Sequence, residues 1–243
     1  MLTPDSPALP RSRGLLVHLQ GHILLFYQKP ASHHDSSAGT RLLFVVVVLE
    51  AVRLGALKWT YARLPLLLFV PLLLGLALLS VRFVAGVRLS QIGLYSWHKW
   101  TAPEKSYFVQ LLVIANVVFP LLFATRLRTI LGQPSALATA LNVFVPYLFF
   151  GFYQEVVYRG MLQSELVRRW GAFAGILISN IFYTFGPLHW NYFSPLNLSM
   201  FASIFAIGLF FGVLFKRSGN LWIVAIIHGI GNAYIVGSLQ PTR

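Results

Sequence analysis

The chain contains no cysteine and few charged residues, and both absences narrow its class. Without cysteine there is no disulfide, no thiolate metal ligand and no cysteine nucleophile. Only 10% of the 243 residues are charged, against about 25% in soluble domains, and just six are acidic. Hydrophobic residues make up 57%, which is the opposite of a disordered composition. The composition indicates a polytopic membrane protein.

Seven apolar stretches are candidates for membrane-spanning helices, which need about 20 apolar residues each. They lie at about 42–57, 64–81, 107–124, 136–166, 172–189, 197–215 and 220–238. We therefore predict an all-α, polytopic membrane helix bundle of about seven transmembrane helices. The bundle should occupy 42–243, after an interfacial segment and polar linker at 1–41. An eighth helix at 14–28, interfacial or N-terminal, is the alternative for that segment.

The basic residues are distributed as membrane topology would require. Nineteen Lys and Arg give a formal net charge of +13, but they stand in ones and twos rather than in a tract. This distribution argues against nucleic acid as a partner and agrees with the positive-inside rule. If the N-terminus is cytoplasmic, twelve fall on the cytoplasmic side and five on the other, with Arg53 and Arg159 inside spans. We expect a multi-pass protein of a bacterial plasma membrane, although an endoplasmic reticulum protein would obey the same rule.

Two pairs of opposite charges interrupt the apolar spans. Glu155 and Arg159 are four residues apart and share one helix face, with Gln154 about 100° round the helix from Glu155. Glu50 and Arg53 are three residues apart in the first span. Such pairs either mark a functional site or only neutralise each other's burial. Both alternatives are open at this point.

Histidines and an amide occupy comparable positions in later spans. Pro187 should end or kink the fifth span and leave His189 at a break, whereas His228 and Asn232 share a face of the seventh span. Counted at 1.5 Å per residue from turns on one side, Glu155, His189 and His228 lie about 20, 27 and 16 Å deep. All three depths are inside a hydrocarbon core of about 30 Å. The spacing therefore predicts that these side chains can converge in one intramembrane cavity.

Three short motifs follow one another along the chain: Q-E-V-V-Y-R at 154–159, F-G-P-L-H at 185–189 and H-G-I-G-N at 228–232. In sequence and order they resemble the motifs E-E-x-x-x-R, F-x-x-x-H and H-x-x-x-N or H-x-x-x-D of the CAAX-protease and bacteriocin-processing (CPBP) family of intramembrane endopeptidases. That family includes the Ras- and a-factor-converting enzyme. The resemblance covers about 134–238, the expected catalytic core.

The resemblance implies an endopeptidase that hydrolyses a peptide bond of a membrane-associated protein or peptide with an activated water. Glu155 and His189 would then act as base, and His228 and Asn232 would stabilise the oxyanion. The expected catalytic residues are Gln154, Glu155, His189, His228 and Asn232, and the expected supporting residues are Arg159, Phe185 and Tyr158. Its partners would be the lipid bilayer and a membrane-embedded or membrane-anchored substrate.

The chain departs from the family at Gln154, where the family has its first glutamate, the residue assigned as general base. Glutamine cannot serve as a base. Either Glu155 takes over in a natural variant, or an inactivating Glu-to-Gln change was introduced, or the protein is a pseudoprotease. The alternative functions are therefore a non-catalytic scaffold or chaperone and a transporter. Visible inverted repeats, which would favour a transporter, are missing from the sequence.

A metal requirement is left open by the sequence. The H-E-x-x-H pattern of zinc peptidases does not occur. His189, His228 and Glu155 could nevertheless supply three ligands and an open position to a divalent metal such as zinc. We expect that no cofactor is required, with zinc as the alternative.

Overall fold

The computed structural model describes residues 36–60, 64–132, 134–190 and 194–235. Every regular element in these ranges is helical, which confirms the predicted all-α bundle. The predicted helix at 14–28 and almost all of the segment 1–41 lie outside the described residues.

Long helices make up most of the molecule, and short 3₁₀ or π segments connect or extend them. The α-helices are α2 (Ser36–Thr60), α3 (Leu66–Leu79), α4 (Ala102–Leu122), α5 (Ala124–Leu131), α6 (Ala136–Glu155), α7 (Ser164–Phe185), α8 (Leu198–Ser218) and α9 (Leu221–Ile235). The π segments are η1 (Ser80–Val84) and η4 (Val156–Gln163), and the 3₁₀ segments are η2 (Leu89–Ile92), η3 (Trp97–Lys99) and η6 (Pro195–Asn197).

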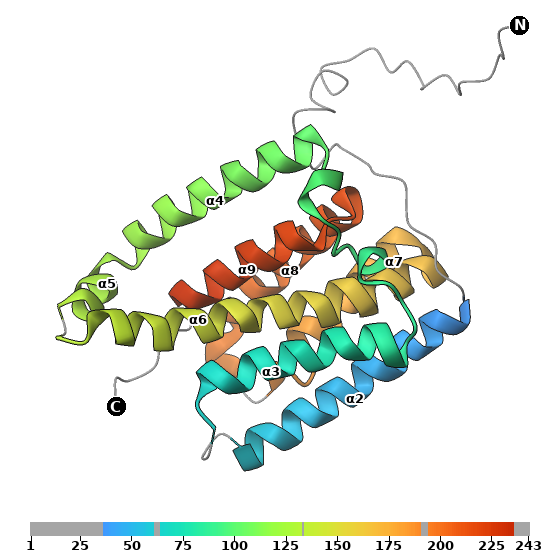
Figure 1. Ribbon diagram of the computed structural model, residues 1–243, viewed down its shortest axis with the longest axis horizontal. Helices are drawn as coiled ribbons and strands as arrows, with labels where there is room; N and C mark the ends of the chain where they lie inside the picture. Colours follow the sequence, from blue (N-terminus) through green and yellow to red (C-terminus); the bar gives the residue numbers. More distant parts are fainter. Residues whose placement is uncertain (1–35, 61–63, 133, 191–193, 236–243) are drawn as a thin grey trace, which may run out of the picture.

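The α6 helix runs through the middle of the bundle. It packs against α9 on one side and α3 on the other, and α2 lies beyond α3 (Figure 1). The α7 helix packs against α8, and α4 lies along α9. Because α6 carries Gln154 and Glu155 at its C-terminal end, the first motif lies at the centre of the fold.

Each of the seven predicted spans falls largely on a helix, but the fifth span was predicted to reach 189 whereas α7 ends at Phe185, and residues 236–238 of the last span lie outside the described residues. Four stretches of the described residues are long and apolar enough to cross a membrane, and they cover five of the predicted spans: Leu66–Val84, Ala102–Leu122, Ala136–Phe185 and Pro195–Ser218. The remaining two lie in α2, which contains Glu50 and Arg53, and in α9, which is apolar but shorter.

Gly171 divides the longest stretch into two. Its φ of 80° and ψ of 171° interrupt the helical run of α7 directly after Trp170. A positive φ is costly for a side chain with a Cβ, so glycine suits this turn. The predicted turn between the fourth and fifth spans is therefore confirmed.

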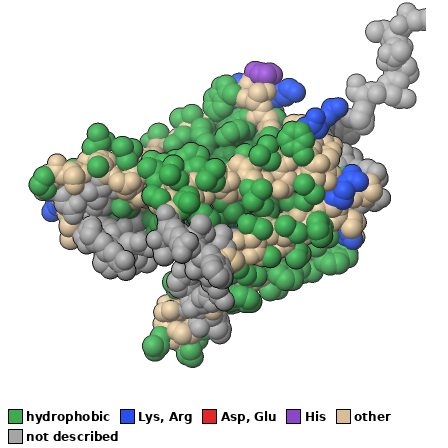
Figure 2. All heavy atoms as spheres, turned by 60° about the horizontal axis from the view of Figure 1, so that its bottom comes forward, with side chains coloured by type: hydrophobic (Ala, Val, Ile, Leu, Met, Phe, Trp, Pro, Cys, Tyr) green, Lys and Arg blue, Asp and Glu red, His purple; other side chains and the backbone are tan. Residues whose placement is uncertain are grey.

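The surface exposes many more large hydrophobic side chains than the surface of a water-soluble protein does. Phe44, Phe83, Leu121 and Phe173 are 63%, 75%, 72% and 82% exposed, and many other large hydrophobic side chains are exposed with them. Figure 2 shows hydrophobic side chains over most of one face, with most of the visible Lys and Arg toward one end. Contiguous apolar surface of this size is typical of contact with lipid. The protein is an integral membrane protein.

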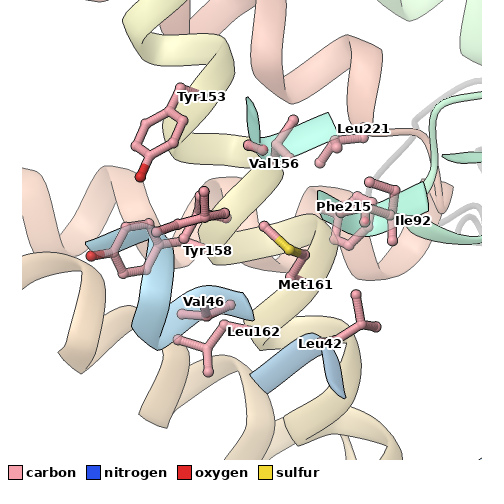
Figure 3. Packing of buried hydrophobic residues seen from close by; sticks show 14 of the residues in the cluster. Leu42, Val46, Ile92, Tyr153, Val156, Tyr158, Met161, Leu162, Phe215 and Leu221 are labelled. Carbon is pink, nitrogen blue, oxygen red and sulfur yellow. The ribbon is translucent and has the colours of Figure 1, made fainter. Parts of the chain in front are cut away.

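The π segment η4 is the most enclosed part of the chain. All eight of its residues are buried, and its apolar side chains meet Leu42 and Val46 of α2, Ile92 of η2, Phe215 of α8 and Leu221 of α9 (Figure 3). A π turn displaces side chains from the ordinary helical register, and such turns are frequent at functional sites. Here it begins directly after Glu155.

A capping box begins α4, and its glutamate also binds the start of α9. The Thr101 side chain accepts from the backbone N–H of Glu104, whose carboxylate accepts from the Thr101 N–H at 2.7 Å. Such a reciprocal cap satisfies two N–H groups at the start of a helix. Asn220 also donates to Glu104, at 3.4 Å, so this end of α4 is tied to the beginning of α9.

Candidate active site

A carboxylate and an imidazole from distant parts of the chain meet at the centre of the bundle. Glu155 Oε1 lies 2.6 Å from Nδ1 of His228, although the two residues are 73 positions apart. Glu155 is fully buried and His228 is 7% exposed. A carboxylate can only accept, so the Nδ1–H of His228 is the donor. The first and third motifs therefore form one site.

Glycines bring α6 and α9 close enough for this contact. A Cβ added to Gly151 would lie 2.5 Å from the Cα of Gly229, and one added to Gly229 would lie 2.5 Å from the carbonyl oxygen of Leu148. No real Cβ would be accommodated at these distances. The first glycine of the H-G-I-G-N motif therefore has a packing role, and it sets the distance between Glu155 and His228.

The two amides of the predicted site form a second pair across the same helices. Asn232 Nδ2 donates to Gln154 Oε1 at 2.8 Å, over 78 positions of sequence. Gln154 is 2% exposed, whereas Asn232 is half-buried. Glu155 and Gln154 thus each bind a different residue of the third motif.

Arg159 contacts the same carboxylate oxygen as His228. Its Nη1 lies 3.3 Å from Glu155 Oε1, and its Nη2 donates to the Gly208 carbonyl of α8 at 2.9 Å. The guanidinium also lies over the ring of Tyr183, 4.2 Å from the centroid. Arg159 is 1% exposed, so the ion pair with Glu155 is shielded from solvent. Glu155 Oε2 is buried and has no hydrogen-bond partner among the described residues.

His189 lies beside this cluster but binds a main-chain atom rather than Glu155. Its Nδ1 is 2.8 Å from the carbonyl oxygen of Tyr183, and its ring meets that of Tyr183 edge to face at 5.2 Å. Since a carbonyl only accepts, Nδ1 carries the proton. Among the described residues, the imidazole bonded to Glu155 is that of His228. The expected joint action of Glu155 and His189 is therefore not a direct contact in this structure.

The supporting residues have different surroundings. Phe185 is 46% exposed and stacks on Phe201 of α8 at 5.8 Å. Tyr158 is 2% exposed, and its ring meets that of Tyr183 edge to face at 5.4 Å. Phe185 therefore contacts α8, and Tyr158 contacts α7.

The second charge pair lies outside this cluster but close to it. Arg53 Nη2 donates to Glu50 Oε2 at 2.7 Å, and both residues are buried. The Tyr153 hydroxyl donates to Glu50 Oε1 at 3.3 Å, which connects the pair on α2 to α6. The pairing expected from the i,i+3 spacing is confirmed.

Two polar residues of α7 belong to the cluster although the motifs do not include them. Tyr183 contacts His228, His189 and Arg159, and Asn180 donates to the Phe205 carbonyl of α8 at 2.9 Å. Asn180 could have been found as a polar residue in an apolar span. A tyrosine in such a span carries no comparable signal.

In the part of the chain that the structure describes, the side chains available to a metal do not form a ligand set. Within the described ranges, no group of three or more His, Cys, Asp or Glu is arranged to hold a metal ion. The Nδ1–H groups of His189 and His228 are directed at a carbonyl and a carboxylate.

A comparison with known protein families matches the segment of the chain that contains the three motifs. Residues 136–234 match the family model Rce1-like, described as type II CAAX prenyl endopeptidase Rce1-like. No curated protein and no solved structure matches the chain. The matched segment begins with α6 and ends within α9, so it contains all three motifs and each residue of the cluster described above. Over this segment the chain is similar to the Rce1-like group of the CPBP family, the family that the motifs indicate.

Proposed function

We propose that this protein is an intramembrane endopeptidase that hydrolyses a peptide bond near the membrane anchor of its substrate, with a C-terminal, prenylated CAAX-type peptide as the first substrate class to test. The family description names a prenyl endopeptidase. The single observation that carries the proposal is the buried contact of 2.6 Å between Glu155 and His228 inside the matched segment. Two helices would not bring a carboxylate and an imidazole together in hydrocarbon without compensation or function.

His189 is the residue that we assign to accept the proton of the attacking water. With Nδ1–H donating to the Tyr183 carbonyl, the neutral ring has its lone pair on Nε2. His189 is half-buried, so a substrate can reach it more easily than it can reach Glu155. The water oxygen would bond to the peptide carbon, and the proton taken by Nε2 would then pass to the leaving amine.

Glu155 would stabilise positive charge on both imidazoles. It would act on His228 through their hydrogen bond and on His189 through the electric field of the buried Glu155 carboxylate. Arg159 restrains that carboxylate through the same oxygen. The half-buried Asn232, paired with Gln154, supplies amide N–H groups for the oxyanion; removal of one such donor typically costs about 10²–10³ in rate. In this assignment Gln154 accepts from Asn232 and orients that amide, and it is not a base.

The test is cleavage of quenched-fluorescent peptides, prenylated and unprenylated, by the protein in nanodiscs. We expect the chain to cleave as it stands, and the variants Glu155→Gln, His189→Ala and His228→Ala to insert but lose activity. The control is His98→Ala, because His98 is exposed and, among the described residues, its hydrogen bond is to Ser96. Full activity in any of the three variants would remove that residue from the mechanism.

A second candidate function is a non-catalytic scaffold that holds a membrane peptide. The observation that favours it is the glutamine at position 154, where the family has its first glutamate. The comparison of the chain with its Gln154→Glu variant separates the two candidates, and Gln110→Glu on the exposed face of α4 is the matched control. Activity in Gln154→Glu alone would mean that the first motif position is the base and this chain is an inactive form. If neither protein cleaves and both are folded, the scaffold is favoured, and membrane peptides that co-purify should be sought.

A further inference from the structure

Tyr183 contacts both histidines of the cluster. Its hydroxyl oxygen lies 3.2 Å from Nε2 of His228, and its carbonyl oxygen lies 2.8 Å from Nδ1 of His189. The side chain is 6% exposed. None of the three sequence motifs includes this position.

The hydroxyl contact is directional because of what His228 does at its other nitrogen. Nδ1–H donates to Glu155, so in the neutral ring Nε2 has a lone pair and can only accept. The Tyr183 O–H is therefore the donor to Nε2. Both nitrogens of His228 are then engaged, and its tautomer is determined by its two partners.

The carbonyl contact follows from the position of Pro187. In a continuing helix the carbonyl of residue 183 would accept from the N–H of residue 187, but proline has no N–H. The residue before a proline also avoids the helical region, and Gly186 is extended with φ −81° and ψ −165°. The helix therefore ends at Phe185, and the Tyr183 carbonyl is free to accept from His189.

The ring of Tyr183 is held in place from several sides. Arg159 lies over it at 4.2 Å, and the rings of Tyr158 and His189 meet it edge to face. A cation over a buried aromatic face is attracted to the ring and restrains it. A rigid ring places the hydroxyl and the carbonyl, its two polar groups, in fixed directions.

We propose that Tyr183, with its carbonyl released by Pro187, is the positioning residue that sets the tautomers of both histidines. Each imidazole is held with the proton on Nδ1 and the lone pair on Nε2. The lone pair of His189 is left for the substrate water, whereas that of His228 is occupied by the tyrosine hydroxyl. The inference rests on the proposed function for its catalytic consequence, but the tautomers themselves do not depend on any activity.

The direct test is nitrogen NMR of the full chain, labelled in its histidines and reconstituted in nanodiscs, since the shift distinguishes protonated from unprotonated ring nitrogens. The His189→Gln and His228→Gln variants assign the two residues. We expect both rings to be protonated at Nδ1 only. Tyr183→Phe should move the Nε2 signal of His228 and leave His189 unchanged, whereas Pro187→Ala should move the Nδ1 signal of His189.

A ring protonated at Nε2 in the unaltered chain, or signals that stay in place in both variants, would overturn the proposal. Because this readout needs no substrate, it decides the question even if no hydrolysis is found. The control is Tyr107→Phe, which removes a hydroxyl on α4, outside the cluster, and should leave all histidine signals unchanged.

Where the chain cleaves peptide, kinetics provide a second readout. Partners that orient a functional histidine typically contribute about 10–100-fold in metal sites, and we expect Tyr183→Phe to lower kcat by that order with KM within about twofold. Tyr183→Leu removes the ring as well. If only ring packing mattered, Tyr183→Phe would retain full kcat and Tyr183→Leu alone would lose it, and this result would refute the hydroxyl's role.

Discussion

Arg159 has a geometry that lysine cannot reproduce. Its guanidinium reaches Glu155 with Nη1 and the Gly208 carbonyl with Nη2, and its flat face covers Tyr183. Lysine has a single ammonium group on a flexible stem and cannot make these three contacts together. We predict that Arg159→Lys lowers the free energy of unfolding by about 1–3 kcal/mol, the usual cost of a buried polar group left without its partner. Thermal unfolding in detergent measures this loss.

The matched control for this change is Arg128→Lys on the exposed surface of α5. Surface substitutions usually change stability by less than about 0.5 kcal/mol. Equal stability of the two variants would show that the contacts of Arg159 carry no net energy.

At the scale of single residues, the sequence predicts which residues belong to the site better than it predicts which of them contact each other. Glu155, His189, His228 and Asn232 were identified because polar groups in apolar spans are expensive and therefore informative. Which of them touch could not be derived, since it depends on the rotation of α9 against α6. Tyr183 was missed because an aromatic residue is unremarkable in a membrane helix, and its partner His228 is 45 positions away.

The approach of α6 and α9 depends on two glycines, and one substitution tests it. A Cβ on Gly151 would lie 2.5 Å from the Cα of Gly229, so Gly151→Ala must push the helices apart. We predict a loss of about 1–3 kcal/mol in unfolding free energy, as for other overpacked interiors, together with reduced cleavage because Glu155 and His228 separate. Thermal unfolding and the peptide assay measure the two effects.

Gly75 on α3 provides the control, because a Cβ there would meet nothing within 4 Å. Alanine is the better helix former by about 1 kcal/mol, so Gly75→Ala should be neutral or stabilising. If the Gly151→Ala and Gly75→Ala variants had the same free energy of unfolding, that result would contradict the close packing of α6 on α9.

At the scale of elements, helix positions were predictable and local irregularities were not. Within the described residues, each of the seven predicted spans falls largely on a helix, because about 20 apolar residues have few other options in a bilayer. The π turn at η4 depends on how its eight buried residues pack against α2, η2, α8 and α9. No local pattern in the sequence encodes that packing.

The arrangement of the whole molecule gathers the basic connections at one end, which we call the basic end. Arg169 Nη2 donates to Thr40 at the start of α2, and Arg41 Nε donates to the Ala85 carbonyl after η1. The Leu221 N–H donates to the Gly93 carbonyl, so the start of α9 lies there as well. The segments that the charge distribution assigns to the cytoplasm are therefore neighbours in space. The helix α5 follows α4 away from this end (Figure 1).

The absence of cysteine makes the orientation directly testable by labelling single introduced cysteines. Ser96 is exposed in the loop at the basic end, and Thr129 is exposed on α5. If the basic end faces the cytoplasm, as the positive-inside rule predicts, an impermeant maleimide added to intact cells should label Thr129→Cys but not Ser96→Cys. Permeabilisation should make Ser96→Cys reactive, which shows that the site is accessible once the membrane is open. The opposite pattern would place the basic end outside and invert the topology. Labelling of both cysteines in intact cells would contradict the assignment of loop and α5 to opposite membrane faces.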